Sequence, residues 1–382
     1  MAYLGDLFFH IRNGANIKQG FDNTGFPITR IETISNKTVN RQKMGYAGIT
    51  DISKYSDYIL QDGDILMSHI NSEIHLGKTA LYEKENDEII IHGMNLLSLR
   101  PKKDLITSKY AFYYLSSQAF LRQIPNITKK SVNQASFTVS ALKELKFPVT
   151  TIEKQKQITN DLDKVCKLIE LRKQQLSKLD ELIKARFVEM FDSKGYPTTT
   201  IGELVETKVP SAKKSFHATD VIKYIDISSI DNKRNVMTGY TEYVLEEAPS
   251  RAQQHIKKGD IVVSTVRPNL KNVAITGYDY DNLVASSGFC VLRAEKCLPS
   301  YLMAIVCSDD FTDAMTKVVT GANYPAIKDS NVKNYVVYNP PVERQEQFAA
   351  FVEQVDKSKF AVQQSLERLE TLKKSLMQKY FA

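Results

Sequence analysis

The sequence predicts an α+β protein built as a tandem repeat, in which two similar mixed α/β domains are separated by two long helices packed as an antiparallel coiled coil. Three observations lead to this fold class. Residues 151–191 and 341–381 are similar, apolar side chains recur along both at helical spacing, and the segments that precede them also match. The predicted parts are a first domain at 1–150, a long helix at 151–195, a second domain at 196–339 and a long helix at 340–382, related by a pseudo-twofold axis.

Each long run carries an apolar stripe in which spacings of four and three residues alternate. This spacing is typical of a helix that packs along a partner helix. The stripe residues expected to pair are Ile158, Leu162, Val165, Ile169, Leu176 and Leu179 in the first run, and Phe348, Val352, Val355, Val362, Leu366 and Leu369 in the second. Two ordinary core helices are the alternative, but after the first residue of each run no glycine or proline interrupts it.

Local signals indicate where these helices start and stop. Thr150 and Glu153 have the spacing of a capping box, and Asn339 with Pro340 supplies a cap and a proline at the first helical position. Gly195 follows the first run and predicts its end. A twofold axis between two paired copies makes the helices antiparallel. We therefore expect a two-helix spacer, on the order of 60 Å long at about 1.5 Å per residue.

The two domains also repeat each other. QDGDILMS at 61–68 matches KKGDIVVS at 257–264, and KYAFYYLSSQAF at 109–120 has the layout of SYLMAIVCSDDF at 300–311. KSVNQASFTVSALKELKF at 130–147 likewise pairs with TGANYPAIKDSNVKNYVV at 320–337. The expected elements are strands in DILMS, DIVVS, EIIIHG at 88–93 and FCVLRA at 289–294, and helices from Tyr110 to Leu121 and from Tyr301 to Met315.

The overall composition excludes several classes of protein. Hydrophobic residues make up 42% and charged residues 25% of 382, which are ordinary values for a globular protein and argue against disorder. No apolar stretch approaches about 18 residues and no secretory start is evident, so we expect a soluble cytoplasmic protein without a membrane partner. The four cysteines form no C-x-x-C pair and are interpreted as reduced thiols. A net charge of +7 favours a polyanionic partner.

One tripeptide imitates a methyltransferase site. Asn339-Pro340-Pro341 is like the loop with which adenine N6-methyltransferases hold the target amine, but Val342 stands where an aromatic residue should stack on the base. No glycine-rich strand-turn-helix for S-adenosylmethionine is evident. We interpret the tripeptide as the start of a helix.

Two further sequence patterns do not meet the requirements of a nucleotide-binding or metal-binding site. Gly77-Lys78-Thr79 is like the end of a P-loop, yet Ser72 occupies the position of the required first glycine. The six histidines fall into no spacing with cysteines or carboxylates that a metal cluster would show. We therefore expect no catalytic residue, no metal and no cofactor bound by this chain.

The layout resembles the specificity (DNA-recognition) subunit of type I restriction-modification enzymes. The pieces that carry the resemblance are IEKQKQI…LDELIKARFVEMF, its second copy VERQEQF…LETLKKSLMQKYF, and the GDIL and GDIV strands. Their order and duplication cover the whole chain. The resemblance implies two target-recognition domains, each followed by a helix, in a non-catalytic subunit that recognises a bipartite, gapped target in double-stranded DNA.

Side chains suited to DNA occupy matching places in both domains, since Lys and Arg hold phosphates while Arg, Asn, Gln and Ser read base edges. In the first domain the candidates are Arg41 and Lys43, then Ser68, His69 and Asn71 after GDILMS, then Lys129, Lys130, Asn133 and Gln134. In the second domain they are Lys213 and Lys214, then Ser264, Arg267, Asn269 and Lys271 after GDIVVS, then Asn323 and Tyr324. Lys233 and Arg234 are interpreted as solvated loop charges. Because the two sets differ, we expect them to recognise two different half-sequences.

The resemblance also implies the partners. Two modification subunits would carry the S-adenosylmethionine chemistry on adenine N6, and restriction subunits, which use ATP and Mg, would join them. Two alternatives stay open. A tandem-repeat scaffold that binds protein without recognising DNA would lack a steep salt dependence of DNA binding. A methyltransferase in its own right would bind S-adenosylmethionine without a partner.

Overall fold

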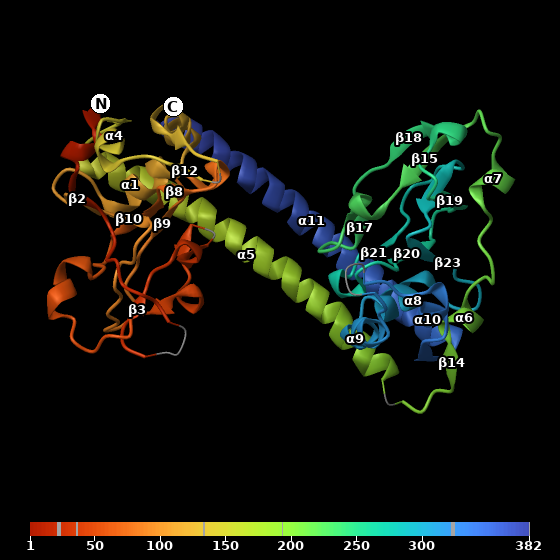
Figure 1. The fold of residues 1–382 in the computed structure, drawn as a ribbon. Helices are drawn as coiled ribbons and strands as arrows, with labels where there is room; N and C mark the ends of the chain where they lie inside the picture. The colour runs from red at the N-terminus through yellow and green to blue at the C-terminus, as the bar shows by residue number, and fades with distance from the viewer. Residues whose placement is uncertain (21–23, 36, 133, 193, 322–324, 382) are drawn as a thin grey trace. The chain divides into compact units, whose positions relative to one another are not determined.

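The computed structural model describes residues 1–20, 24–35, 37–132, 134–192, 194–321 and 325–381 (Figure 1). The chain divides into two compact units. Unit 1 is Met1–Lys173 with Gln364–Ala382, and unit 2 is Gln174–Gln363. Each unit thus holds one globular domain and one half of each long helix. Among the described residues, no helix combines the length and the apolar character needed to span a membrane.

The two long runs are helices, as predicted. α5 extends over Ile152–Phe191 and α11 over Val342–Phe381, each 40 residues without a break. The predicted caps are wrong, however. Thr151 rather than Thr150 caps α5, because its Oγ1 accepts a hydrogen bond from the Lys154 N–H at 3.3 Å.

The start of α11 also differs from the expected cap. Asn339 does not begin the helix, because its N–H donates to the Pro197 carbonyl at 2.7 Å and continues a strand pair. The N–H groups of Arg344 and Gln345 donate instead to the Pro341 carbonyl. The side-chain amide of Gln345 donates to the Pro340 carbonyl at 3.0 Å, and Pro340 lies outside the helix.

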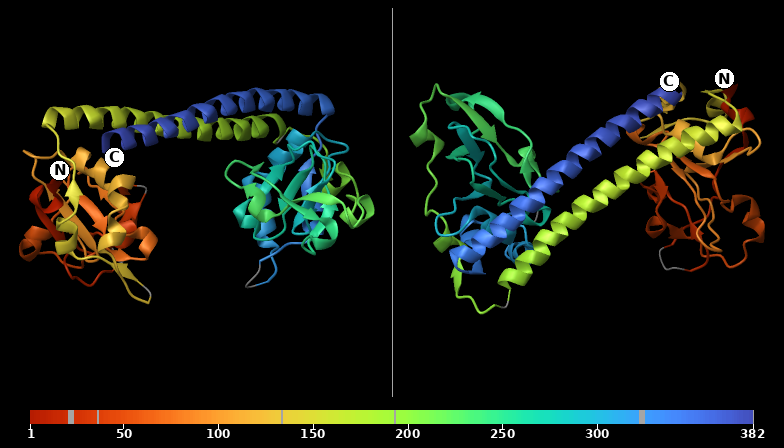
Figure 2. Two further views of the ribbon diagram at one scale, coloured as in Figure 1. Left: turned by 90° about the horizontal axis from the view of Figure 1, so that it is seen from above. Right: turned by 180° about the vertical axis from the view of Figure 1, so that it is seen from behind.

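Within each unit the two helices run antiparallel, as predicted. In unit 1, the Tyr380 hydroxyl donates to Asp161 at 2.9 Å, and Lys173 pairs with Glu370 at 3.7 Å. Rising residue numbers on α5 therefore meet falling numbers on α11. Figure 2 shows the C-terminal half of α11, in blue, alongside the N-terminal half of α5.

Arg172 of α5 and Lys359 of α11, two polar residues that interrupt the apolar stripes, make contacts between the helices. Arg172 Nε donates to Ser365 Oγ at 3.2 Å in unit 1, and Lys359 Nζ lies 2.6 Å from Asp180 in unit 2. The stripe residues themselves are shielded from water. Ile158, Leu162, Val165, Ile169, Phe348, Val355, Val362 and Leu366 are buried, and Leu176, Leu179, Val352 and Leu369 are half-buried.

Unit 1 is built on a six-stranded sheet of order β2-β10-β7-β9-β5-β4. The strands are β2 (Phe8–Asn13), β10 (Leu96–Pro101), β7 (Ile65–Ser68), β9 (Thr79–Leu81), β5 (Thr38–Val39) and β4 (Ile34–Ser35). The strand expected in DILMS is β7. The strand expected at 88–93 is absent, because this buried segment makes only isolated bridges, from Ile91 to Ile28 and Ile59 and from Gly93 to Ala15. Its apolar run reflects burial rather than strand pairing.

Unit 2 contains a four-stranded sheet of order β18-β15-β22-β19 and a three-stranded sheet of order β21-β20-β23. The strands are β18 (Thr241–Val244), β15 (Val221–Ile225), β22 (Leu283–Ser286), β19 (Ala252–His255), β21 (Val273–Ile275), β20 (Ile261–Ser264) and β23 (Phe289–Leu292). The strands expected in DIVVS and FCVLRA are β20 and β23, which pair antiparallel with Ile261 opposite Leu292.

Each of the two shorter predicted helices is split in two. α1 (Ser108–Leu115) is followed by α2 (Gln118–Leu121), and α8 (Pro299–Val306) by α9 (Asp309–Lys317). The cause is a serine at each break. Ser117 Oγ accepts from the Phe120 N–H, and Ser308 Oγ accepts from the Phe311 N–H, so each serine starts a new helix.

Short elements complete both units around these cores. In unit 1 they are β1 (Ala2–Tyr3), β3 (Pro27–Ile28), β6 (Gly45–Tyr46), α3 (Ile124–Ile127), α4 (Val139–Lys143) and β13 (Lys146–Phe147). In unit 2 they are β14 (Thr198–Thr200), α6 (Ile201–Leu204), α7 (Ala212–Ser215), α10 (Asp329–Lys333) and β24 (Val336–Tyr338).

Two glutamines at equivalent places in the repeat attach each long helix to its own domain. Gln155 and Gln345 are both fully buried. Gln155 Oε1 accepts from the Thr107 N–H, and Gln345 Oε1 accepts from the Leu298 N–H, both at 2.8 Å. Thr107 and Leu298 are the N-caps of α1 and α8. The same bond therefore fixes the same helix in both copies.

A buried arginine–aspartate pair is also repeated. Arg100 binds Asp64 through two hydrogen bonds of 2.8 and 2.7 Å, and Arg293 binds Asp260 in the same way. Both aspartates belong to the Gly-Asp turns that precede β7 and β20. The same ion pair therefore holds the turns that lead into β7 and β20 in both units.

Candidate nucleic-acid interface

In unit 1 a small sheet brings two of the predicted clusters together. β8 (Ile70–Asn71), β11 (Lys129–Lys130) and β12 (Ala135–Ser136) form a three-stranded sheet of order β11-β12-β8. Asn71 lies opposite Ala135, and Lys129 lies opposite Ser136. The residues that follow the GDILMS strand therefore adjoin the residues that precede α5.

The hairpin between β11 and β12 presents polar groups and one apolar side chain to solvent. Both the N–H and the Oγ of Ser131 donate to the Gln134 carbonyl at 2.8 Å, which closes the turn. Lys129, Lys130 and Gln134 are exposed, and Val132 is 100% exposed. Lys130 pairs with Glu73 at 2.9 Å on the surface. Asn133 lies outside the described residues.

Unit 2 repeats this arrangement. Val266 bridges to Ala326, and Thr320 bridges to the same residue. In unit 1 the equivalent pair is Ile70 opposite Ser136. The segment after GDIVVS therefore again adjoins the segment before the long helix. The predicted residues Asn323 and Tyr324 lie between the bridged positions but outside the described residues.

The loop after β20 carries the exposed candidates of unit 2. Arg267 and Asn269 are exposed, and the Arg267 N–H donates to the Pro325 carbonyl at 2.8 Å. A short 3₁₀ turn, Pro268–Leu270, follows Arg267. Lys271 ends the loop and is ion-paired with Asp309 at the start of α9. Cationic and amide side chains thus project from a loop whose backbone is fixed at several points.

Comparison with known proteins identifies this repeated arrangement. A family model described as the type I restriction modification DNA specificity domain matches residues 2–181 and again residues 194–373. The chain belongs to this family. Each matched segment contains one domain and most of the long helix that follows it, so the family unit is the repeat seen in the sequence. The chain is thus a specificity subunit with two recognition domains.

Relatives of the specificity domains align with different shares of the chain. It is 40% identical over 208 residues to the "Putative type I restriction enzyme MjaX specificity subunit" of Methanocaldococcus jannaschii, an alignment that spans 53% of this chain and 49% of the relative. The chain thus spans about half the length of that relative. It is 23% identical over 354 residues to the type I restriction enzyme MjaVIII specificity subunit of the same organism, spanning 84% of this chain and 79% of the relative.

Two solved structures share the fold of the specificity subunit. One is the S subunit of a type I restriction-modification system from M. genitalium, with a TM-score of 0.57 at 14% identity, covering 100% of this chain and 95% of the other. The second comes from work on the assembly and conformational transition of a type I R-M system, with a TM-score of 0.56 at 15% identity, covering 100% and 96%.

Three of the predicted DNA-contacting side chains are buried in the specificity domains. Ser68, His69 and Ser264 are only 3%, 6% and 3% exposed. Ser264 Oγ donates to the Val266 carbonyl, and Ser68 Oγ accepts from the Asn71 amide, so both serines shape the loops from inside. Burial holds the pKa of His69 down at about 4 and keeps the ring neutral. We correct the prediction for these three residues, because they do not reach the surface.

Other predicted residues lie away from the loop clusters. Arg41 forms ion pairs with Glu88 at 2.6 Å and with Glu85 at 2.8 Å, whereas Lys43 is exposed. Lys213 and Lys214 are exposed on α7, which packs against β19 of the four-stranded sheet. The structure does not bring Arg41 or these two lysines to the loops after β7 and β20. Their role in DNA binding stays a prediction.

The sequence did not lead us to expect a hairpin that borders the loop after β20 in unit 2. β16 (Ile230–Asp231) and β17 (Val236–Met237) enclose Asn232, Lys233, Arg234 and Asn235. The amide of Asn232 donates to the Leu270 carbonyl at 2.8 Å, and that of Asn235 donates to the Val273 carbonyl at 3.1 Å. The turn that carries the exposed Lys233 and Arg234 is therefore anchored by its two asparagines to the segment that follows β20. The available signal was the polar turn Asp-Asn-Lys-Arg-Asn between Ile230 and the apolar pair Val236-Met237.

No group of three or more His, Cys, Asp or Glu side chains among the described residues is placed to hold a metal ion. Burial raises the pKa of the Cys290 and Cys297 thiols to about 12, which makes poor nucleophiles of them.

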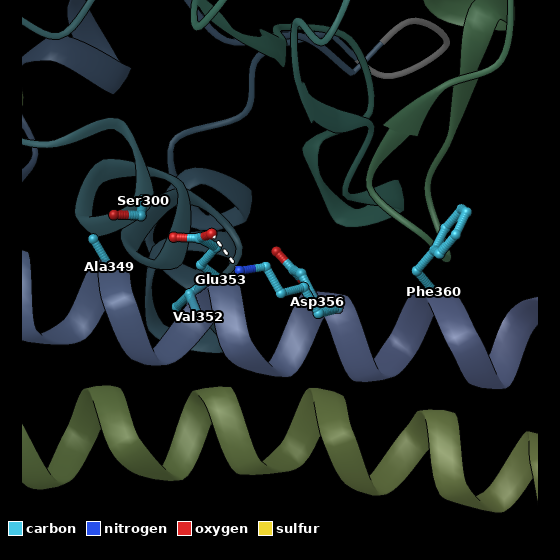
Figure 3. A pocket seen from close by; sticks show the side chains of 7 residues that line it. Ser300, Ala349, Val352, Glu353, Asp356 and Phe360 are labelled. Atoms are coloured by element: carbon cyan, nitrogen blue, oxygen red, sulfur yellow. Dashed lines mark ion pairs between the residues drawn. The ribbon is translucent and has the colours of Figure 1, made fainter.

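An open groove of about 530 Å³ runs along one face of α11 in unit 2 (Figure 3). Its lining comprises Ser300, Ala349, Val352, Glu353, Asp356, Lys357 and Phe360. Glu353 and Lys357 pair across one turn of the helix at 2.7 Å, and Phe360 is 66% exposed. This mixture of exposed apolar and paired charged side chains is typical of a surface that contacts another macromolecule rather than of an enclosed site for chemistry.

Proposed function

We propose that this specificity subunit recognises a bipartite, gapped target in double-stranded DNA, with one half-sequence read by each domain. One observation supports the proposal. In both units, the loop that follows β7 or β20 lies beside the segment that precedes the long helix. In unit 1 this pair of segments presents Asn71, Lys129 and Gln134, whereas in unit 2 it presents Arg267 and Asn269. Equivalent frames that carry different reading residues suit two different half-sequences.

The charge of the chain supports the same proposal. The net charge is +7, and the exposed basic residues next to these loops include Lys129, Lys233 and Arg234. Lys and Arg contact phosphates and release condensed counterions, so specific binding should weaken steeply as salt rises. In the alternative, a scaffold that binds protein alone, any weak DNA binding would show no preference for one sequence.

An exchange of domains tests the proposal. Residues 1–150 are replaced by the matching segment of a relative that has a different target, and adenine methylation is mapped across the host genome. We expect one half of the methylated sequence to change and the other half to persist. The matched control replaces residues 196–339 instead and should change the other half. A change in both halves after either exchange would contradict one-domain-per-half recognition.

We further propose that each repeat docks one modification subunit, an adenine N6-methyltransferase, on an exposed helix face. Six identities between the copies are exposed in both, so core packing does not explain them: Glu153/Glu343, Gln157/Gln347, Lys167/Lys357, Gln174/Gln364, Leu182/Leu372 and Lys184/Lys374. At about 100° per residue, five of the six pairs lie within about 100° of arc on the helix, and Lys184/Lys374 lies about 80° outside it. An exposed face that both copies have kept suits two copies of one partner, and Lys357 lines the groove on α11.

Charge reversal on this face tests the docking. Lys167→Glu and Lys357→Glu are made singly and together, and the mass of the complex with the methyltransferase subunit is measured. We expect each single variant to lose one copy of the subunit and the double variant to lose both. The control is Lys164→Glu, an exposed lysine of α5 at which the copies differ. Full assembly of the double variant would place the docking elsewhere.

The remaining partners and the absence of catalysis belong to the same proposal. Restriction subunits that use ATP and Mg would join the complex, which would act on DNA in the cytoplasm, and S-adenosylmethionine would bind to the modification subunits. The purified chain alone should therefore not be labelled by radioactive S-adenosylmethionine under ultraviolet light. Labelling at the level of a known methyltransferase would support the rival in which this chain performs the transfer.

A further inference from the structure

The loop after β20 in unit 2 places two cationic residues in left-handed backbone. Arg267 has φ +51° and Lys271 has φ +52°, and they bracket the 3₁₀ turn Pro268–Leu270. This region is sterically unfavourable for residues with a Cβ and is adopted readily by glycine. Such strain persists only where the surrounding structure maintains it, and it is concentrated at functional sites.

Unit 1 meets the same backbone requirement with a glycine. The two loops close in the same way, by Ser68 N–H to the Lys78 carbonyl and by Ser264 N–H to the Asn272 carbonyl, both at 2.9 Å. Gly77, with φ +72°, precedes the first closing residue as Lys271 precedes the second. The repeat thus has a form without strain at this position, and unit 2 carries a lysine there instead.

The side chain of Lys271 is held by an acid that a second lysine also contacts. Lys271 Nζ pairs with Oδ1 of Asp309, and Lys184 Nζ on α5 lies 3.6 Å from Oδ2 of the same carboxylate. The hydrogen bond from Lys271, with the charge of Lys184, holds the pKa of Asp309 below its usual value. Two ammonium groups therefore share one carboxylate, which leaves one positive charge in excess.

The ion pair is not needed to hold the loop in place. The Arg267 N–H is bound by the Pro325 carbonyl, and the Leu270 carbonyl by the Asn232 amide. Asp309 is 72% exposed at its side chain, and ion pairs so open to water contribute little to folding. A purely structural role therefore does not explain why a lysine occupies a position that favours glycine.

We propose that Lys271 is a gated phosphate contact of the second half-site. In the free chain Asp309 holds its ammonium group, and on DNA binding Lys271 exchanges that carboxylate for a backbone phosphate while Lys184 continues to neutralise Asp309. The inference rests on the proposed function, because it names a DNA ligand for one residue of the same interface. It adds that Asp309 competes with the phosphate for Lys271. It also adds that the left-handed backbone at Lys271 lowers the stability of the chain.

The substitution Lys271→Gly separates stability from binding. Relief of the left-handed strain should raise the thermal midpoint of unit 2 by about 2–4 °C. Loss of one phosphate contact should weaken binding to a duplex with both half-sites about fivefold at 0.15 M salt and reduce the salt slope by about 0.9. The matched control is Lys37→Gly, since Lys37 has φ +69° in a turn of unit 1. It should also stabilise the chain but leave second half-site binding unchanged.

The substitution Asp309→Asn tests the gate. Release of Lys271 should tighten DNA binding by up to about fivefold, and this gain should disappear in the Lys271→Gly background. An equal gain in both backgrounds would show that Asp309 does not act through Lys271. A more stable Lys271→Gly chain with unchanged affinity and salt slope would also overturn the inference while leaving the proposed function intact. Wild-type chain without sequence-specific DNA binding would instead refute the proposed function itself.

Discussion

The buried glutamine at the start of α5 gives the sharpest test of how the helix is attached to its domain. Gln155 is fully buried and makes three hydrogen bonds. Its Oε1 accepts from the Thr107 N–H at 2.8 Å, and its Nε2 donates to the carbonyls of Leu105 at 3.0 Å and Thr150 at 2.9 Å. Leucine has a similar volume and can make none of these bonds. Gln155→Leu therefore leaves three backbone groups without that partner.

The expected loss of stability follows from the free-energy cost of leaving those backbone groups without a hydrogen bond. Each buried polar group left without a partner costs about 1–3 kcal/mol, and the leucine recovers part of this sum by burying apolar surface. A net loss of roughly 2–4 kcal/mol is expected. For a unit of this size, each kcal/mol lowers the thermal midpoint by about 2–4 °C. The midpoint of unit 1 should therefore fall by roughly 5–15 °C.

Hydrogen exchange on the full chain can localise the effect. Peptides covering residues 105–115 should lose protection in Gln155→Leu, while peptides covering residues 296–306 should not, and Gln345→Leu should show the reverse. Gln157→Leu is the matched control, because Gln157 lies half a turn further along the same helix and is exposed. If Gln155→Leu destabilises unit 1 no more than Gln157→Leu does, then the buried bonds do not fix the helix to the domain.

Three further predictions concern acid stability, the buried ion pair and the length of α5. Burial lowers the pKa of His92 to about 3 and that of His69 to about 4, so the unfolded chain binds more protons below pH 6.5. The stability of unit 1 should therefore be complete above pH 6.5 and decline as the pH falls towards 4, and His69→Leu should flatten this decline in calorimetry. Arg293→Leu should cost roughly 3–5 kcal/mol in urea unfolding, because Asp260 is only 1% exposed and loses its counterion, and adding Asp260→Asn should recover part of the loss. Four residues inserted after Lys173 add about 6 Å of helix to α5, and we expect methylation mapping to show a longer unread gap with both half-sequences unchanged. An unaltered gap would mean that α5 does not set the spacing.

Much of the fold could be predicted from the sequence, because its signals are local. The apolar stripes predicted the start of α5 to within one residue and that of α11 to within two, since side chains four and three positions apart share a helix face. The Gly-Asp turns predicted β7 and β20. The repeat itself indicated the antiparallel helices and the family. The errors at 88–93 and at the breaks before α2 and α9 occurred where burial or a single serine cap outweighed the apolar pattern.

The candidate site depended far more on the tertiary structure. The pairing of Asn71 with Ala135 and of Val266 with Ala326 joins segments about 60 residues apart, and the sequence offered only the matched order of the clusters. His69 is buried rather than exposed, because its ring packs edge-on against Phe137.

By itself, then, the sequence determined the repeat, the long helices and the residue types available for DNA. The structure alone decided which of those residues face solvent, that Asn232 fixes the loop carrying Arg267, and that Lys271 adopts left-handed backbone beside Asp309. The physical reason is the range of the interactions. Helix periodicity acts over a few residues of chain, whereas exposure, ion pairing and backbone strain in a loop are set by segments that only the folded chain brings together.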